Sequence, residues 1–234
     1  MVPFSFAYAF CGEEFLLTRS NALYWPRESA LLVADLHLEK ASFYASSGQL
    51  LPPYDSRETL ERVASAIRET GARRVYTLGD NFHDSDGPAR LEPYAAGMLA
   101  ALTRAVDWVW ITGNHDAQLG DQAGGTPLEE LVVGGMVLRH RAAPGETRPE
   151  LSGHYHPRLQ LTVRQRRIRR PCAVVSADRA GCGRMILPAF GALTGGMDAG
   201  DRAILDAMQP ATRIDAVLPA GSRLARFPLW REAA

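Results

Sequence analysis

The sequence predicts an α/β fold built around two sheets, and three observations support this. The 234 residues are 46% hydrophobic and 22% charged, which suits one large domain with a full core, so we expect a single domain over residues 1–234. The first half alternates apolar runs of strand length with segments of helical periodicity, which indicates parallel strands joined by crossovers. The second half has short apolar runs between glycine- and proline-containing turns, which indicates a second, more antiparallel sheet.

The first half of the chain shows clear hydrophobic periodicity. The apolar run at 30–34 has no polar interruption, as expected of a buried strand, and Asp35 follows it directly. Residues 55–70 carry apolar side chains at 3- and 4-residue spacings before Gly71, so they are predicted to form a helix. In chain order we expect a strand or hairpin, a strand, a helix, a strand, a helix and a strand, at about 4–25, 30–34, 55–70, 74–78, 91–103 and 106–112.

The second half is expected to contain short strands between turns. In the stretch 159–164 the apolar residues Leu159, Leu161 and Val163 alternate with polar ones, as a half-buried strand requires. The arginines that follow this stretch are therefore expected near a hairpin tip. The strands are expected at 132–138, 159–163, 172–176, 184–187 and 214–218.

Charge is balanced overall but unevenly distributed. The formal net charge is zero, so no overall field favours a nucleic-acid partner. Of the 26 basic residues only Lys40 is a lysine. Between residues 158 and 187 there are eight arginines and one acid, Asp178, so this region is locally cationic.

The cysteines and the N-terminal segment bear on the compartment. Cys11, Cys172 and Cys182 are an odd number without CxxC spacing, so we expect buried or idle thiols, with neither a disulfide framework nor a cysteine zinc site. The apolar N-terminal segment has no basic leader, and Glu13 and Glu14 interrupt it before it reaches signal-peptide or membrane length. We expect a cytoplasmic protein with no membrane partner.

Each of the six histidines lies in or beside a turn that follows an apolar run. Ligands of open α/β sheets bind outside the carboxyl ends of the strands, so we expect these turns to converge. The two-residue spacing of Asp35 and His37, repeated in His154 and His156, directs both side chains of a pair to one face of extended backbone. Asp80 is the best candidate to bridge two cations, and the ligand types suit Mn, Fe or Zn.

The ordered series DxH, GDxxH, GNHD, H and GHxH, over residues 35–156, resembles the calcineurin-like metallophosphoesterase signature. The resemblance implies an α/β/β/α sandwich and a site for two divalent cations. His115 resembles the histidine that contacts the phosphate and protonates the leaving oxygen. His140 has no tight motif around it, and a surface position is the competing interpretation. The implied ligands are Asp35, His37, Asp80 and His156 for one metal, and Asp80, Asn114, His140 and His154 for the other.

The chain departs from many protein-phosphatase relatives at one position. His83 stands where they have an aspartate that orients the catalytic histidine, and it cannot supply a carboxylate. Asp84, Asp86 or Asp116 could orient His115 instead, and His83 could contact the scissile phosphate. A purely structural histidine is the competing interpretation of His83.

Further segments resemble the bacterial ligase-associated DNA damage response metallophosphoesterases. They are DLHLEK at 35–40, GQLLPPYD at 48–55, GDNFHD at 79–84 and PAFGALTGG at 188–196. This narrower resemblance implies a Mn²⁺-dependent endonuclease acting on single-stranded DNA, with Fe or Zn as alternative metals. It also implies a functional association with a DNA ligase, an exonuclease and a helicase. Taken alone, 188–196 indicates a strand end and glycine turn, although its backbone amides could line a substrate groove.

The expected mechanism is that of a two-metal hydrolase. The cations would lower the pKa of a shared water, so that the bridging hydroxide attacks phosphorus in line, and His115 would be the general acid. Such sites also serve phosphatases and nucleotide phosphodiesterases, so a small phosphate ester is the alternative substrate. A non-catalytic binding scaffold is a more distant alternative, because a scaffold would be expected to have lost ligands.

Two surface features bear on a DNA substrate. A group of arginines close in sequence to the last two histidines could bind the phosphate backbone, with a solvated hairpin as the competing interpretation. Three aromatic residues, Phe43, Tyr44 and Tyr54, could stack on unpaired bases or instead pack in the core. The arginines in question are Arg164, Arg166, Arg167 and Arg169.

Overall fold

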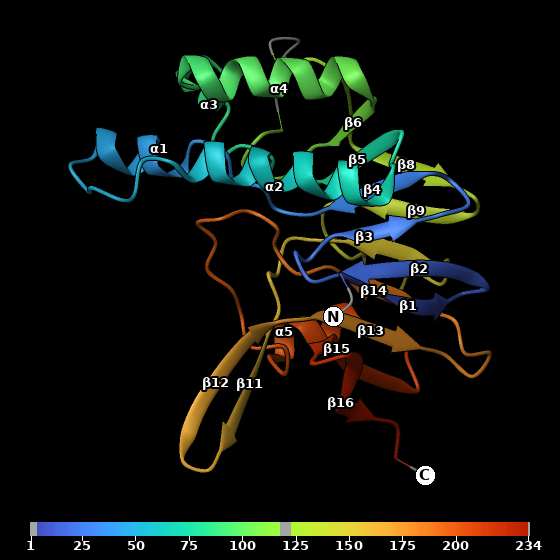
Figure 1. Ribbon diagram of the computed structural model, residues 1–234. Coiled ribbons are helices and arrows are strands. Elements are labelled where there is room, and N and C mark those ends of the chain that lie inside the picture. The colour runs from blue at the N-terminus through green and yellow to red at the C-terminus, as the bar shows by residue number, and fades with distance from the viewer. Residues whose placement is uncertain (1–3, 118–122, 234) are drawn as a thin grey trace.

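The computed structural model describes residues 4–117 and 123–233. Two seven-stranded sheets pack face to face, and helices cover their outer faces (Figure 1). The arrangement is an α/β/β/α sandwich, which confirms the expected fold class. Among the described residues, no helix is both long and apolar enough to cross a membrane.

The first sheet follows chain order without a crossing. Its first four strands form an antiparallel meander, and the remaining pairs are parallel, as the alternation of strands and helices predicts. In spatial order the strands are β1 (Ser5–Phe10), β2 (Glu13–Thr18), β3 (Leu23–Trp25), β4 (Ala30–Val33), β5 (Arg74–Leu78), β6 (Asp107–Ile111) and β7 (Thr126–Leu128).

The second sheet is mixed and mostly antiparallel. Only the pairs that β10 makes with β9 and β14 are parallel. In spatial order its strands are β16 (Arg223–Arg231), β15 (Arg213–Ala220), β13 (Ala173–Ala177), β14 (Arg184–Ile186), β10 (Glu150–Ser152), β9 (Met136–Arg139) and β8 (Glu130–Val133). The strand expected at 132–138 is wrong, because Gly134 and Gly135 take positive φ values of 55° and 81° and turn the chain into a β8–β9 hairpin.

A separate two-stranded hairpin projects from the body of the molecule (Figure 1). It consists of β11 (Arg158–Val163) and β12 (Arg166–Pro171). Arg164 and Gln165 form its tip, both with positive φ, as a tight two-residue hairpin turn requires. The predicted hairpin is confirmed.

Helices flank both sheets. The longest, α2 (Asp55–Thr70), has the predicted bounds and ends at Gly71, whose φ is 70°; α4 (Pro93–Ala105) begins after Glu92, whose carboxylate accepts from two main-chain N–H groups of the first turn. The shorter helices are α1 (Lys40–Ser46), α3 (Gly87–Arg90) and α5 (Arg202–Ala207).

Three apolar clusters hold the layers together. Leu32 of the first sheet and Leu151 of the second belong to the cluster between the sheets. Leu60 of α2 packs on the outer face of the first sheet, and Ile204 of α5 packs on the outer face of the second. Each sheet is therefore covered on both faces, which explains why its central strands are continuous apolar runs.

Two of the cysteines are paired, contrary to the sequence-based expectation. Cys11, at the turn between β1 and β2, forms a disulfide with Cys182, in the loop before β14, with the two Cα atoms 4.7 Å apart. The partners are 171 residues apart in sequence, so no local spacing could indicate the pair. Cys172 is a buried free thiol, as expected.

Candidate metal centre

The histidine-containing turns converge at one edge of the sandwich. Asp35, Asp80 and Asn114 follow the parallel strands β4, β5 and β6 of the first sheet, and His140 and His154 follow β9 and β10 of the second. The sheets are held together at this point, because His154 N donates to the Asp35 carboxylate and His140 Nδ1 lies 3.1 Å from the Leu78 carbonyl. Both sheets therefore contribute side chains to the same place.

One group of four side chains has the geometry of a metal site. The ligand atoms of Asp35, His37, Asp80 and His156 lie within 4.8 Å of one another. His37 Nε2 is 3.2 Å from His156 Nε2 and 3.7 Å from Asp80 Oδ2, and His156 Nε2 is 3.5 Å from Asp35 Oδ1. Donor atoms about 3–3.5 Å apart suit a cation with bonds of about 2.1 Å to each.

A second group surrounds His140, which is buried rather than on the surface. His140 Nε2 is 3.0 Å from Asn114 Oδ1, 3.0 Å from His154 Nδ1 and 3.4 Å from Asp80 Oδ1. Three different residue types thus point a nitrogen or oxygen at one position. Imidazole, amide oxygen and carboxylate without thiolate suit Mn, Fe or Zn.

Asp80 belongs to both groups through different oxygens. Its Oδ1 faces His140 and its Oδ2 faces His37, and Oδ1 also accepts a hydrogen bond from His115 N at 3.1 Å. A carboxylate held in this way can bridge two cations. Asp35 is held similarly, since both of its oxygens accept from His154 N at 3.0 Å.

The backbone at this edge is strained. Five of the seven predicted ligands are non-glycine residues with φ between 46° and 74°, in the left-handed region that side chains rarely adopt. Such residues persist only where the surroundings impose them, and they cluster at functional sites. They are Asp35, His37, Asp80, His154 and His156.

Two glycines are required by close approach. Gly79 has a φ of 79°, and a Cβ there would meet the His140 ring. A Cβ at Gly113 would meet the main chain and carboxylate of Asp80. The glycines in the GDxxH and GNHD turns thus leave room for the proposed ligands, in addition to permitting tight turns.

Hydrogen bonds to the far side of the rings select the nitrogen that faces each group. His140 Nδ1 lies 3.1 Å from the Leu78 carbonyl, so it carries the proton and leaves Nε2 as an electron-pair donor. His37 Nδ1 lies 3.4 Å from His83 Nδ1. Burial is the main cause that lowers the pKa of His37 and of His154, which favours the neutral ring that a metal ligand must be.

His83 has a clear structural environment. Burial, with the neighbouring charges of Lys40 and His115, lowers its pKa to about 4. A neutral His83 can accept the Nδ1 proton of His37, while its ring stacks on His115 with centroids 5.0 Å apart and planes at 19°. His83 therefore supports two neighbouring imidazoles at once.

His115 lies over the site and is oriented by a main-chain group. Its Nδ1 is 3.0 Å from the carbonyl oxygen of His83, so Nδ1 donates a hydrogen bond to that oxygen. The other ring nitrogen, Nε2, faces the ligand groups and is 3.9 Å from Asp80 Oδ2. The side chain is 39% exposed, so solvent reaches the imidazole. Position 83 thus supplies an acceptor for His115 through its backbone, which any residue type would provide.

The aspartates considered for orienting His115 have other partners. Asp116 is buried, and its carboxylate accepts from the main-chain N–H groups of Asn81, Phe82 and Gly113. Asp84 pairs with Arg90 at 2.8 Å, and Asp86 is exposed. Within the described part of the chain none of the three hydrogen-bonds to His115, and Asp116 instead ties the turns after β5 and β6 together.

The predicted arginines lie on different faces of the β11–β12 hairpin. Register places Arg166 opposite Val163, on the face of Leu159 and Leu161, whereas Arg167 and Arg169 lie on the other face with Arg158. On that second face, the Arg158 guanidinium donates to the Thr194 and Gly195 carbonyls at 3.1 and 3.2 Å, and Arg169 donates to the Gly196 carbonyl. Arg164 is at the tip.

The aromatic residues are not in the core. Phe43 is 39% exposed and Tyr54 69%, and Tyr44 is half-buried. Phe43 and Tyr44 place their ring centroids 4.7 and 5.4 Å from that of His83. The loop 192–195 lies across a groove from Tyr44, so residues of the PAFGALTGG segment do line a groove beside the candidate site.

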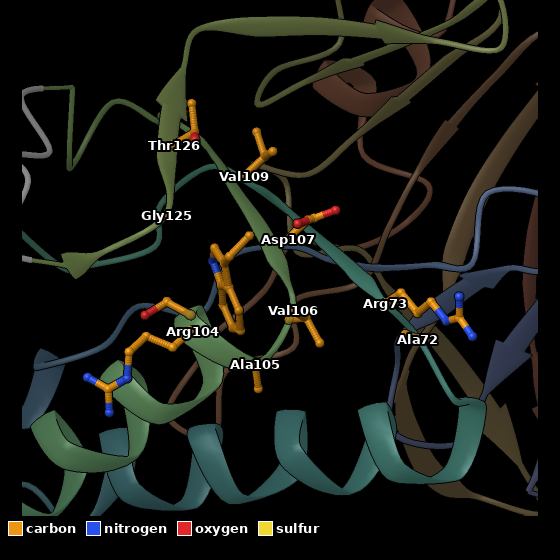
Figure 2. Close-up of a pocket in the computed structure, with 11 residues that line it drawn as sticks. Ala72, Arg73, Arg104, Ala105, Val106, Asp107, Val109, Gly125 and Thr126 are labelled. Carbon is orange, nitrogen blue, oxygen red and sulfur yellow. The ribbon is translucent and has the colours of Figure 1, made fainter.

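A different cavity, of about 840 Å³, lies at the opposite edge of the first sheet (Figure 2). It is lined by residues at the amino ends of β5 and β6, including Arg73, Arg104 and Asp107. None of the six histidines lines it. The chemistry-bearing side chains gather at the carboxyl ends instead.

Comparisons with known proteins concern the family and the fold. A family model described as calcineurin-like phosphoesterase matches residues 29–169. Among solved structures, nuclease MPE of Pseudomonas putida has a TM-score of 0.69 at 29% identity, over 96% of this chain and all of that one. YfcE, a phosphoesterase from E. coli, has a TM-score of 0.42 at 14% identity, over 86% of this chain and 98% of its own. No curated protein matches the chain.

Proposed function

This chain belongs to the calcineurin-like phosphoesterase family, and we propose that it is a Mn²⁺-dependent endonuclease that cleaves single-stranded DNA. Membership of this family means that the chain is a metal-dependent hydrolase of phosphate esters. The proposal adds the metal and the substrate. The observation that carries it is Asp80, whose two oxygens face two separate groups of ligand atoms.

The proposed ligands are those of the two groups described above. When bound, two cations would supply an activated water and neutralise charge on the phosphoryl oxygens. Asp35 and Asp80 provide the negative charge that holds the cations, and the neutral imidazoles complete the donor sets. Asn114 contributes an amide oxygen beside His140.

We assign the general-acid role to His115. Its Nδ1–H is engaged by the His83 carbonyl, so the proton available for transfer is on Nε2. In a cationic His115 that proton would pass to the departing sugar oxygen as the P–O bond breaks. Such a transfer contributes about 10²–10⁴-fold to rate. The stacked His83 ring keeps the imidazole plane in place.

DNA is preferred over a small ester for two reasons. The nuclease from Pseudomonas putida is similar over nearly the whole of both chains. The ligand-bearing turn at His156 also continues directly into the arginine-rich hairpin, and Asn114 and His115 are exposed to solvent. The resemblance of the segments at 35–40, 48–55, 79–84 and 188–196 further supports a repair role alongside a DNA ligase, an exonuclease and a helicase.

A reconstitution assay tests the proposal. Metal-stripped protein is restored with Mn²⁺, Fe²⁺, Zn²⁺ or Mg²⁺ separately and offered circular single-stranded DNA, duplex DNA, and nucleotide monoesters and diesters. We expect linearisation of the single-stranded circle, with Mn²⁺ the most effective. Rapid hydrolysis of nucleotides without cleavage of the circle would instead establish the small-ester alternative.

A further inference from the structure

A groove beside the candidate metal centre has the features of a nucleotide subsite. Resting on the function proposed above, we propose that it binds the nucleotide next to the scissile phosphate. In this subsite Lys40 contacts the phosphate of that nucleotide and the Tyr44 ring lies against its base. The subsite would make the site selective for a chain of nucleotides over an isolated phosphodiester.

The groove has a volume of about 430 Å³ and two walls. One wall is α1 and the segment after it, with Lys40, Tyr44, Gln49 and Leu51. The opposite wall is the loop 192–195. Arg158 holds this second wall from outside through the Thr194 and Gly195 carbonyls, and Ala192 N donates to Thr59 Oγ1 at 3.0 Å.

The groove is continuous with the catalytic group. The His115 ring stacks on His83 at 5.0 Å, and the Tyr44 ring lies 5.4 Å from His83 on the groove side. A substrate whose scissile phosphate lies under His115 therefore extends past His83 to Tyr44. A neighbouring nucleotide of the same strand is the group that such a substrate would place there.

Lys40 places a cation on the wall of this groove. It is the one lysine among 26 basic residues, is half-buried, and makes no hydrogen bond or ion pair with any residue in the described parts of the chain. The nearby Asp55 carboxylate is engaged, since it accepts from Ala41 N at 3.1 Å. Burial lowers the pKa of Lys40 more than the nearby Asp55 carboxylate raises it, so an anion of the substrate at this position would stabilise the charged side chain.

The backbone at Lys40 is held firmly. On one side Glu39 N donates to Ser56 Oγ at 2.7 Å, and the Ser56 hydroxyl donates to Glu39 Oε1 at 2.7 Å. On the other side Ala41 N donates to Asp55. Both anchors come from the first turn of α2, so the ammonium starts from a fixed point and less ordering is needed on binding.

Exposed apolar side chains in the segment that carries this wall favour a base over a simple anion, and the Phe43 ring lies 5.5 Å from that of Tyr44. The segment 43–54 carries three exposed large apolar residues, namely Phe43, Leu50 and Tyr54. Unpaired bases stack on aromatic rings such as those of Phe43 and Tyr54 without sequence preference. A cation for a phosphate beside aromatic faces for a base is the combination that a single-stranded nucleotide requires.

Thymidine trinucleotides test the phosphate contact. One has two phosphodiesters, and two others carry an uncharged methylphosphonate at the first or second linkage, which leaves one cleavable linkage with a neutral neighbour. With wild-type protein we expect one of the substituted trinucleotides to lose about tenfold or more in kcat/KM. Lys40→Gln should lose a similar factor on the all-phosphate trinucleotide and little more on the substituted one.

Controls separate this contact from general effects. Lys40→Arg keeps the charge and should retain most of the discrimination, and Arg202→Gln removes a charge from α5, on the outer face of the second sheet, and should behave as wild type. Metal content and Tm are measured for each variant, and Lys40→Met replaces Lys40→Gln if the latter does not fold.

For the base contact, Tyr44→Leu should remove the roughly fivefold or greater preference for a base over an abasic sugar on the same side.

Two results overturn the subsite: equal losses from methylphosphonate in wild type and Lys40→Gln, or no loss at either position in wild type. A different result would show that the proposed nuclease function itself is wrong. Metal-loaded wild-type protein would then hydrolyse bis(p-nitrophenyl) phosphate but cut neither the trinucleotides nor longer single strands.

Discussion

At the scale of single residues, Asp80 offers one oxygen to each of two ligand groups. We predict that Asp80→Ala weakens divalent-metal binding at both positions by more than about 100-fold, because a directly bound ligand matters more than the residues behind it. His37→Ala should weaken only the group that includes Asp35 and His156. The measurement is metal content after gel filtration, with metal-dependent Tm as a second readout, since added metal stabilises only a protein that binds it. Two equivalents retained by Asp80→Ala would contradict the bridge.

His83 supports His37 through its side chain and His115 through its carbonyl. We therefore predict that His83→Ala keeps the acceptor for His115 but lowers metal affinity about 10–100-fold by removing the partner of His37 Nδ1. His83→Asn offers a side-chain oxygen as acceptor and is the matched control, which should recover part of the affinity. Metal titration of both variants checks this. A variant His83→Ala with normal metal affinity and reduced turnover would point instead to contact with substrate.

Six of the seven ligand candidates could be predicted at this scale because each lies in a short motif of residue types that bind metals, whereas His140 was indicated only by its place in the ordered series. The seven side chains implied by the resemblance are brought together in the structure. The orientation of His115 could not be predicted, because a main-chain carbonyl acts as the acceptor and leaves no trace in residue type. The same holds for Leu78, whose carbonyl orients His140.

At the scale of elements, the β11–β12 hairpin divides its arginines between two faces. Arg167 and Arg169 share the face that contacts residues 194–196, whereas Arg166 and Arg170 share the face of Leu159 and Leu161. We predict that Arg167→Gln/Arg169→Gln flattens the log-affinity versus log-salt slope for single-stranded DNA by roughly 0.7 per lost contact.

The double variant Arg166→Gln/Arg170→Gln removes the same charge from the same hairpin and serves as the control. If the DNA lies along the face that carries Arg167 and Arg169, the salt slope of this control variant should change less. Binding is measured in a metal-free, inactive background over a salt series. Equal slopes for the two variants would mean that the hairpin acts only through its net charge or not at all.

Elements with strong periodicity were predictable, and short or tightly turned ones were not. The helix at 55–70 and the strand at 74–78 have the predicted bounds. Strand β10 has three residues, too few for a period to appear, and α1 has seven residues with one buried side chain. The β8–β9 hairpin was expected as one strand because its apolar residues continue on both sides of Gly134 and Gly135.

At the scale of the whole molecule, the candidate site depends on how two sheets meet. The first sheet supplies the carboxylates, and the second supplies His140, His154 and, after β10, His156. Convergence at strand ends could be predicted, because parallel strands end at one edge. Which strands of the second sheet lie beside that edge could not be predicted, because Glu150 of β10 pairs with the distant Arg184 of β14.

The disulfide between Cys11 and Cys182 joins the two sheets at a place remote in sequence. A cross-link that closes a loop of 171 residues is expected to contribute about 4–5 kcal/mol by restricting the unfolded chain. We predict that reduction lowers the Tm of oxidised protein by roughly 10–20 °C, and that Cys11→Ser/Cys182→Ser lowers it equally and abolishes the response to reductant.

Burial raises the pKa of the Cys172 thiol to about 12, so almost none of it is thiolate at pH 8. Titration with a thiol reagent should therefore detect no reactive thiol in the native oxidised protein and one after denaturation without reductant. Three reactive thiols after denaturation would show that the pair had not formed, and one in the native protein would show that Cys172 is not enclosed.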